Sequence, residues 1–178
     1  MRAATIAVLA GLTAAAAVGS VAQSQPAAVD PYAAVCRPGE RGPALEAQIV
    51  GLRDRIGTIR IELYPPNDPE FLSNSRLLLD TSKDFRRVDM PVPPSGPVTL
   101  CVRAPHTGEY AVSVLHDRHR IGKFNLMSAG AGFGNNPRLD FSQPKAALAT
   151  MTIGPGVTTT RIVLNYFHGL SFSPLREK

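Results

Sequence analysis

Short runs of alternating apolar and polar residues are the feature that most constrains how this chain folds. Thr58–Tyr64 reads TIRIELY and Glu109–His116 reads EYAVSVLH, so every second residue is apolar in both segments. In the first of them, Ile59, Ile61 and Leu63 would share one face. A period of two residues predicts a β-strand that packs one face on a core. The sequence shows neither a heptad nor an internal repeat, and its alternating runs predict an all-β fold.

Seven predicted strands are separated by turn residues at the spacing of a sandwich. The predicted strands are Leu45–Leu52, Thr58–Tyr64, Arg86–Val92, Val98–Ala104, Glu109–His116, Ala146–Gly154 and Val157–Phe167. The first two are expected to pair as antiparallel neighbours across the turn between them. Residues 70–83 fit either a short helix or an insertion between strands. We expect a single immunoglobulin-like or transthyretin-like β-sandwich of about seven strands after a signal peptide.

The beginning of the chain predicts export. Arg2 precedes an apolar core at residues 5–18, and Ser20 and Ala22 are small residues at the −3 and −1 positions of a cleavage site. The apolar core is too short to span a bilayer, so we expect a periplasmic or secreted protein with no transmembrane segment in its mature form. The expected division is a signal peptide at 1–22, an N-terminal arm or linker at 23–43, a β-sandwich domain at 44–168 and a C-terminal tail at 169–178.

Export also changes the interpretation of the two cysteines, Cys36 and Cys101. In an oxidising compartment, two cysteines are expected to form a disulfide. A redox-active pair would use the closer Cys-x-x-Cys spacing, which lowers the pKa of a thiol. We therefore predict a structural disulfide between residues that lie 65 positions apart.

The chain carries a formal net charge of +5, which falls to +4 when Arg2 is removed. Its basic residues are scattered, and segments such as DFRRVD and DRHR mix both signs, so nucleic acid is not an expected partner. A positive net charge favours, as a binding partner, an anionic component of the envelope such as lipid head groups or a polysaccharide. A mildly basic, solvated surface is the simpler explanation.

The segment after Glu109–His116 has the shape of a calcium loop without its ligands. An EF-hand loop provides oxygen ligands at positions 1, 3, 5, 9 and 12 and glycine at position 6. Counted from Asp117, Gly122 occupies position 6, but His119 and Ile121 occupy positions 3 and 5. Calcium binding is therefore not expected. Lys123 is placed to form an internal salt bridge with Asp117 in place of the ion.

His116 and His119 are the residues that could bind a transition metal such as zinc or copper. They lie three positions apart, and no third ligand stands beside them in the sequence. His106 and His168 could approach them only through the fold. Ordinary hydrogen bonds made by histidines that flank a loop are the simpler interpretation of this pair.

The segment GEYAVSVLHD, a Gly-Lys turn and GFGNNP together resemble the secreted bacterial proteins catalogued as domain of unknown function 2141. The residues that fit are Gly108, Tyr110, Ala111, His116, Asp117, Gly122, Lys123, Gly132, Phe133, Asn135 and Asn136. The resemblance covers roughly residues 44–167 and implies a transthyretin-like or immunoglobulin-like sandwich, with no established activity. Where the family carries Asn, this chain has His119 and Ile121, and Asn125 stands in place of an Asp.

The motif GAGFGNN at residues 130–136 contains three glycines and the pair Asn135 and Asn136. A phosphate-binding loop would need a helix immediately after it, and PRLDFSQP does not predict one. Glycine and asparagine tolerate positive φ, so we expect a turn. Phe133 is expected to plug this loop onto the end of the sandwich.

We expect an exported binding or envelope-associated module with an unassigned ligand and no cofactor. The chain contains neither a G-x-S-x-G nor an H-E-x-x-H motif, and it is not expected to be an enzyme. The candidates for ligand contact or for shaping the loops are His116, Asp117, His119, Lys123, Asn125, Phe133, Asn135 and Asn136. A periplasmic transition-metal-handling protein that uses His116 and His119 is the alternative, and a hydrolytic enzyme is a third hypothesis.

Overall fold

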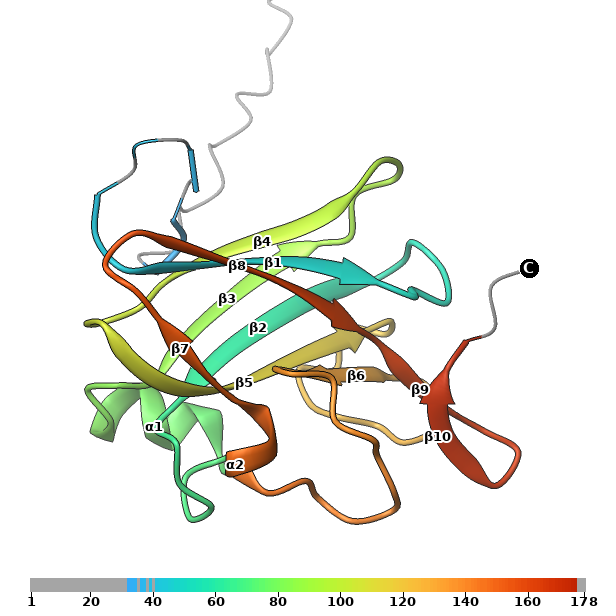
Figure 1. Ribbon diagram of the computed structural model, residues 1–178. Coiled ribbons are helices and arrows are strands. Elements are labelled where there is room, and N and C mark those ends of the chain that lie inside the picture. Colours follow the sequence, from blue (N-terminus) through green and yellow to red (C-terminus); the bar gives the residue numbers. More distant parts are fainter. Residues whose placement is uncertain (1–31, 35, 38, 40, 176–178) are drawn as a thin grey trace, which may run out of the picture.

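The computed structural model describes residues 32–34, 36–37, 39 and 41–175 (Figure 1). The signal peptide expected at 1–22 lies outside these residues. In the described chain the elements are β1 (Ala44–Val50), β2 (Thr58–Tyr64), α1 (Ser75–Thr81), β3 (Arg86–Pro91), β4 (Val98–Arg103), β5 (Gly108–Asp117), β6 (Gly130–Phe133), α2 (Ala146–Ala149), β7 (Thr150–Ile153), β8 (Val157–Val163), β9 (Asn165–His168) and β10 (Ser171–Pro174). None of the described helices is long and apolar enough to cross a membrane.

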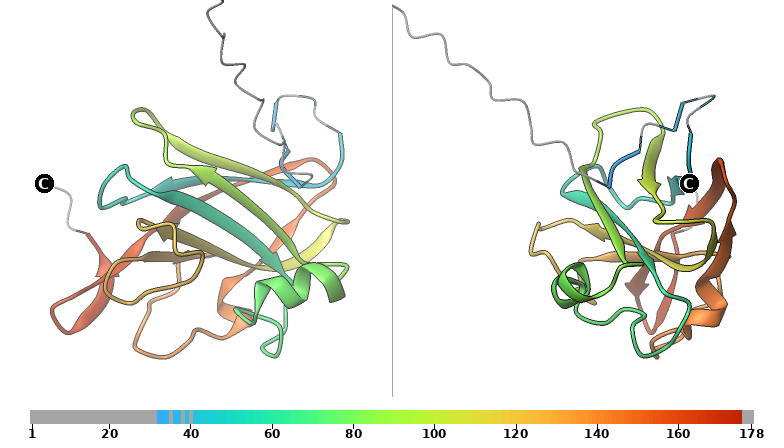
Figure 2. Two further views of the ribbon diagram at one scale, coloured as in Figure 1. Left: turned by 180° about the vertical axis from the view of Figure 1, so that it is seen from behind. Right: turned by 90° about the vertical axis from the view of Figure 1, so that its left-hand side faces the viewer.

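The strands form two sheets that pack as a sandwich, which confirms the predicted all-β fold. The smaller sheet has the order β4-β1-β8, and the larger has the order β10-β9-β6-β5-β2-β3, with β7 also paired to β5. Figures 1 and 2 show the sheets as layers, with α1 and α2 near one end of the larger sheet. Between the layers lie the apolar residues of the alternating runs, among them Leu45, Ala47, Ile49, Ile59, Ile61, Leu63, Leu100, Val102, Val112, Val114 and Ile162.

The predicted pairing of the first two strands is wrong. β1 pairs with β4 and, in parallel, with β8, whereas β2 lies between β3 and β5 in the other sheet. The connection at residues 51–57 therefore carries the chain from one layer to the other. Alternation identifies the face of a strand that is buried, but it does not identify the strand that pairs with it.

Three further segments differ from the expected strands. The predicted strand Ala146–Gly154 begins as the helix α2, and only Thr150–Ile153 forms a strand. The run Val157–Phe167 is divided at Leu164, where the chain passes from β8 in the small sheet to β9 in the large one. β10 continues the large sheet into the segment expected to be a tail.

Residues 70–83 contain the helix α1, one of the two structures that the sequence allowed. The helix begins after Asn74, whose side chain accepts a hydrogen bond from the Arg76 N–H at 3.1 Å, an N-cap interaction. Phe71 and Leu78 from this segment pack on Tyr64 and Phe85 in a second hydrophobic cluster on the outer face of the large sheet. This face is therefore covered by chain rather than left to solvent.

Strand β6 needs glycine at two positions because another part of the chain passes close behind it. A Cβ atom on Gly132 would lie 2.6 Å from Cγ2 of Ile162, and a Cβ on Gly130 would lie 2.5 Å from the ring of Tyr166. The motif GAGF is thus a strand whose glycines face the crossover from β8 to β9. Phe133, expected to plug a loop onto the end of the sandwich, is the last residue of β6, and its side chain is buried on the outer face of the large sheet.

Cys36 and Cys101 form the expected disulfide, with a Cα–Cα distance of 5.8 Å. It joins the N-terminal arm to β4. Two backbone hydrogen bonds reinforce the junction, from Ala34 N–H to Cys101 O at 3.1 Å and from Arg103 N–H to Tyr32 O at 2.9 Å. The arm is therefore attached to the edge of the small sheet over the described residues.

Removal of this disulfide should destabilise the protein. The double variant Cys36→Ala/Cys101→Ala is expected to lose roughly 3–5 kcal/mol of unfolding free energy, because the unfolded chain regains the entropy of a 65-residue loop. Chemical denaturation with and without a reductant measures the loss. Reductant should destabilise the unmodified protein and leave the double variant unchanged. An unmodified protein that is insensitive to reductant would contradict a stabilising disulfide.

Candidate functional site

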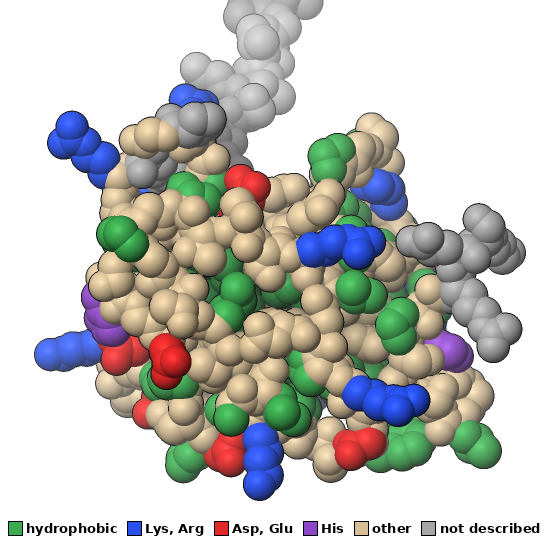
Figure 3. Space-filling model, in the orientation of Figure 1, with side chains coloured by type: hydrophobic (Ala, Val, Ile, Leu, Met, Phe, Trp, Pro, Cys, Tyr) green, Lys and Arg blue, Asp and Glu red, His purple; other side chains and the backbone are tan. Residues whose placement is uncertain are grey.

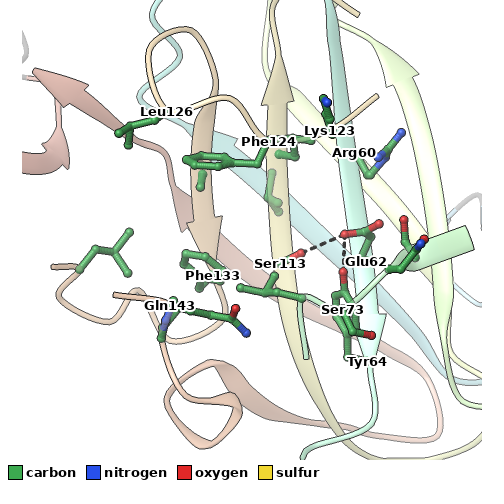
Figure 4. Close-up of a pocket in the computed structure, with 18 of the residues that line it drawn as sticks. Arg60, Glu62, Tyr64, Ser73, Ser113, Lys123, Phe124, Leu126, Phe133 and Gln143 are labelled. Atoms are coloured by element: carbon green, nitrogen blue, oxygen red, sulfur yellow. Dashed lines mark hydrogen bonds between the residues drawn. The ribbon is translucent and has the colours of Figure 1, made fainter. Parts of the chain in front are cut away.

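The outer face of the large sheet carries a groove of about 870 Å³. Its floor is formed by β2, β5 and β6. One wall comes from residues 72–76 before and within α1, and the others come from the loop between residues 121 and 126 and from residues 139–144. Figure 4 shows side chains from these segments converging on the same space. A pocket of this size is in the range that holds a drug-sized molecule.

Most of the groove surface is apolar. Tyr64, Leu115 and Phe133 lie on the floor, and four partly exposed hydrophobic side chains stand around the opening. These rim residues are Ile121, Phe124, Leu126 and Phe141, with exposed fractions of 46, 49, 44 and 72%. Large exposed hydrophobic side chains therefore gather around one opening on this face.

The position of the rim depends on specific contacts. Phe124 packs on Phe172 of β10, with ring centroids 6.0 Å apart. The Arg60 guanidinium donates a hydrogen bond from Nη1 to Gly122 O at 2.9 Å and so fixes the loop above the sheet. Gln143 donates from Nε2 to Phe71 O at 2.9 Å and joins two of the walls. Contacts between the walls therefore maintain the shape of the groove.

Glu62 is a buried acidic residue on the floor, with an exposed fraction of 7%. Its Oε2 atom accepts hydrogen bonds from Tyr64 Oη at 2.6 Å and from Ser113 Oγ at 3.3 Å (Figure 4). Burial, together with the neighbouring charge of Glu62, raises the pKa of Tyr64 well above its usual value. Tyr64 therefore keeps its proton and remains a donor to the carboxylate.

The basic residues nearest to Glu62 in the sheet register bind a different carboxylate. Glu62 lies opposite Arg87 on β3, and Arg60 lies opposite Asp89. Both guanidinium groups donate to Asp89, from Arg60 Nε at 2.8 Å and from Arg87 Nε at 2.9 Å. In the part of the chain that the structure describes, no ion pair within 4.0 Å includes Glu62. The groove thus contains a buried acceptor whose partners among the described residues are two hydroxyl groups.

His116 lies on the opposite face of β5 and stabilises the fold. Its side chain is fully buried, with Nδ1 at 2.6 Å from Tyr166 Oη and Nε2 at 2.8 Å from Ile56 O. Because the Ile56 carbonyl can only accept, Nε2 carries the proton and Nδ1 accepts from the Tyr166 hydroxyl. Tyr166 Oη also accepts from the Arg53 N–H at 3.1 Å. This network joins the connection at residues 51–57 to β5 and β9.

The predicted metal pair is not brought together as a binding site. His116 is buried with both ring nitrogens hydrogen-bonded, whereas His119 is exposed on the following loop. Within the described residues, no group of three or more His, Cys, Asp or Glu side chains is arranged to hold a metal ion. His116 would have to break two hydrogen bonds before it could coordinate a metal.

The loop that resembles a calcium site is closed by its own backbone. The Asp117 carboxylate accepts a hydrogen bond from the Gly122 N–H at 2.6 Å. The expected salt bridge between Asp117 and Lys123 is not found among the described ion pairs, and Lys123 instead lines the groove. Asn125 Oδ1 accepts from the N–H groups of Met127 at 3.0 Å and Ser128 at 3.2 Å, which shapes the turn before β6.

Asn135 and Asn136 follow β6 and hold strands together. Both have positive φ, at 59° and 49°, as expected for a turn. Asn135 Nδ2 donates to Thr150 O at 2.6 Å. Asn136 donates from Nδ2 to Arg161 O at 2.8 Å and accepts from the Val163 N–H at 2.7 Å. These two residues connect β6 to β7 and to β8 of the other sheet.

The sequence interpretation missed Glu62. Alternation places Arg60, Glu62 and Tyr64 on one face of β2, opposite Ile59, Ile61 and Leu63, and such a face is normally solvated. The sequence indicated the burial of Glu62 only indirectly. The segment at residues 70–83 contains several apolar residues, and these residues had to pack on some surface of the sheet.

The pH dependence of stability should identify His116 as a buried neutral group. Burial lowers the pKa of His116 below its usual value of 6.5. The unfolded chain therefore takes up a proton first, so the contribution of His116 is present above pH 6.5 and is lost as pH falls through 6.5 toward the lower folded pKa. The unfolding free energy of the unmodified protein should fall from pH 7.5 to 5.5, and His116→Gln should reduce this slope.

His106→Gln is the matched control. The backbone hydrogen bond to Thr107 and the contact with Asp84 raise the pKa of the exposed His106, so its effect on the slope has the opposite sign. Denaturant titrations at several pH values compare the variants. Equal slopes for the unmodified protein and His116→Gln would contradict this assignment.

Comparison with known proteins identifies a family. No curated protein and no solved structure matches the chain. Residues 47–161, which include most of the sandwich and the floor of the groove, match the family described as uncharacterized protein conserved in bacteria (DUF2141). This match agrees with the resemblance of GEYAVSVLHD and GFGNNP in the sequence. The chain belongs to the DUF2141 family.

Proposed function

We propose that the protein is an exported binding module that holds a small, largely apolar molecule in the groove on the outer face of its large sheet. The observation that supports this function best is the groove itself, because most of its surface is apolar and its volume of about 870 Å³ suits a single small molecule. Export is supported by the leader sequence and by the disulfide between Cys36 and Cys101.

Binding fits the geometry better than metal handling. The groove walls are joined to one another by the Arg60, Gln143 and Phe124 contacts, so the cavity is formed before a ligand enters. A preformed apolar cavity binds a ligand without a large cost of reorganisation. The metal hypothesis instead requires the loss of both hydrogen bonds of the buried His116.

The binding proposal predicts saturable uptake of a neutral apolar probe. N-phenyl-1-naphthylamine, whose fluorescence rises in apolar surroundings, should bind the purified mature protein at one site. Leu115→Lys should weaken this binding by at least about tenfold, since an ammonium group is placed on the apolar floor. Fluorescence titration measures both affinities, and a thermal melt checks that the variant is folded.

Leu148→Lys is the matched control, because Leu148 is 53% exposed on α2 and does not line the groove. It should bind the probe like the unmodified protein. A folded, unmodified protein that shows no saturable binding up to the solubility of the probe would contradict the proposed function. If the two lysine variants weakened probe binding equally, the groove would not be the binding site.

A second role, association with an anionic envelope surface, is supported by the loop between β5 and β6. Phe124 and Met127 are 49 and 70% exposed there, and the basic residues Arg120 and Lys123 are exposed beside them. Apolar side chains flanked by cations suit an anionic lipid surface. On the face shown in Figure 3, by contrast, basic side chains are interspersed with acidic ones.

Vesicle sedimentation tests this second role. The protein should bind vesicles that contain phosphatidylglycerol more strongly than vesicles of phosphatidylcholine alone, and added salt should weaken the binding. Phe124→Ser/Met127→Ser should reduce the bound fraction, whereas Leu148→Ser should not, since Leu148 lies outside the loop. Equal binding of the two variants would exclude this loop as the membrane contact.

A further inference from the structure

We infer that Glu62 makes the groove selective for a molecule that carries a hydrogen-bond donor, above all a primary amine, at the end of an apolar body. This inference rests on the proposed binding function and names the chemical class of its ligand. It starts from the buried carboxylate on the floor, which is 7% exposed and lines the groove.

The carboxylate of Glu62 has unused capacity to accept hydrogen bonds. Its two oxygens offer about four acceptor sites. Both hydrogen bonds found within the described residues, from Tyr64 and Ser113, end on Oε2. Oε1 has no donor among those residues. A buried carboxylate is stabilised by further donors or by a cation, so a ligand that supplies one gains binding energy here.

The neighbouring hydroxyl groups do not donate to Oε1 of Glu62 in place of a ligand. Tyr64 Oη and Ser113 Oγ each have one proton, and both donate it to Glu62. The Tyr64 ring is held in place by Phe71 and Phe85, with ring centroids at 5.4 and 4.9 Å. Around Glu62, the groups that remain for a ligand are Oε1 of Glu62 and the lone pairs of the two hydroxyl oxygens. All of these are acceptors, so this part of the floor matches a donor, whereas the exposed Lys123 lies in the wall formed by residues 121–126.

The nearby arginines form their hydrogen bonds with groups other than Glu62. Arg60 and Arg87 share Asp89, and their remaining hydrogen bonds go to Gly122 O and to Ser75 Oγ at 3.3 Å. In Figure 4 the Arg60 side chain points away from the Glu62 carboxylate. Moving either arginine to Glu62 would remove a partner from Asp89. A protonated amine, which brings both donors and a positive charge, therefore fits Glu62 better than a neutral hydroxyl.

Three probes with the same ten-carbon chain separate the head groups. Decylamine, decanol and decanoate, each below its critical micelle concentration, compete with N-phenyl-1-naphthylamine for the groove. The expected order of affinity is amine, then alcohol, then carboxylate. Decyltrimethylammonium keeps the positive charge but has no N–H donor, and it should bind at least about tenfold more weakly than decylamine. This comparison needs no variant.

Glu62→Gln tests the residue itself. Glutamine has nearly the same shape but no charge, and its amide adds donors to the floor. Measured relative to the naphthylamine probe, the variant should bind decylamine at least about tenfold more weakly, and the preference for amine over carboxylate should shrink or reverse. Glu109→Gln, which removes an exposed carboxylate from β5 outside the groove, should leave every affinity unchanged.

The outcomes distinguish the inference from the function on which it rests. Saturable probe binding with equal affinities for decylamine and decanoate would overturn the role of Glu62 and leave the binding function in place. Equal affinities of decylamine and decyltrimethylammonium would contradict the proposed hydrogen bond from the amine to Glu62. Failure of the unmodified protein to bind the naphthylamine probe would overturn the binding function itself.

Discussion

The sandwich is built around β5, a strand that is buried on both of its faces. Val112 and Val114 point into the sandwich core, whereas Ala111 and Ser113 point to the outer face and are also buried. The outer face is covered because Phe71, Leu78 and Phe85 pack there with Tyr64. Where this cover is incomplete it leaves the groove, and Glu62 lies on the floor of that groove with only 7% of its surface exposed. A two-layer sandwich with a solvated outer face would have neither feature.

The inner face of the same strand explains the most recognisable part of the sequence. His116, at the end of the alternating run, joins the connection at residues 51–57 to Tyr166 on β9. Asp117, the next residue, closes the following loop through the Gly122 N–H. The His-Asp pair therefore secures the two loops at one end of β5, and the shape of a metal loop is produced by hydrogen bonds to backbone.

The fold could be predicted from the sequence to the extent that it depends on local pattern. Thr58–Tyr64 is a strand with the predicted bounds, and Ile59, Ile61 and Leu63 face the core as expected. The pairing of β1 with β8 could not be predicted, because alternation carries no information about which strands are neighbours. The burial of Glu62 was missed for a related reason, since it depends on a distant segment that covers its face.

Intermolecular nuclear Overhauser effects would show whether an apolar molecule lies in the groove with its polar end at Glu62. The measurement uses the isotope-labelled protein and bound, unlabelled decylamine. We expect contacts from the alkyl chain to the Leu115 methyl groups and the Phe133 ring, and contacts from the carbon next to nitrogen to Tyr64. Contacts confined to exposed residues outside the groove, such as Leu148 or Leu170, would contradict this placement.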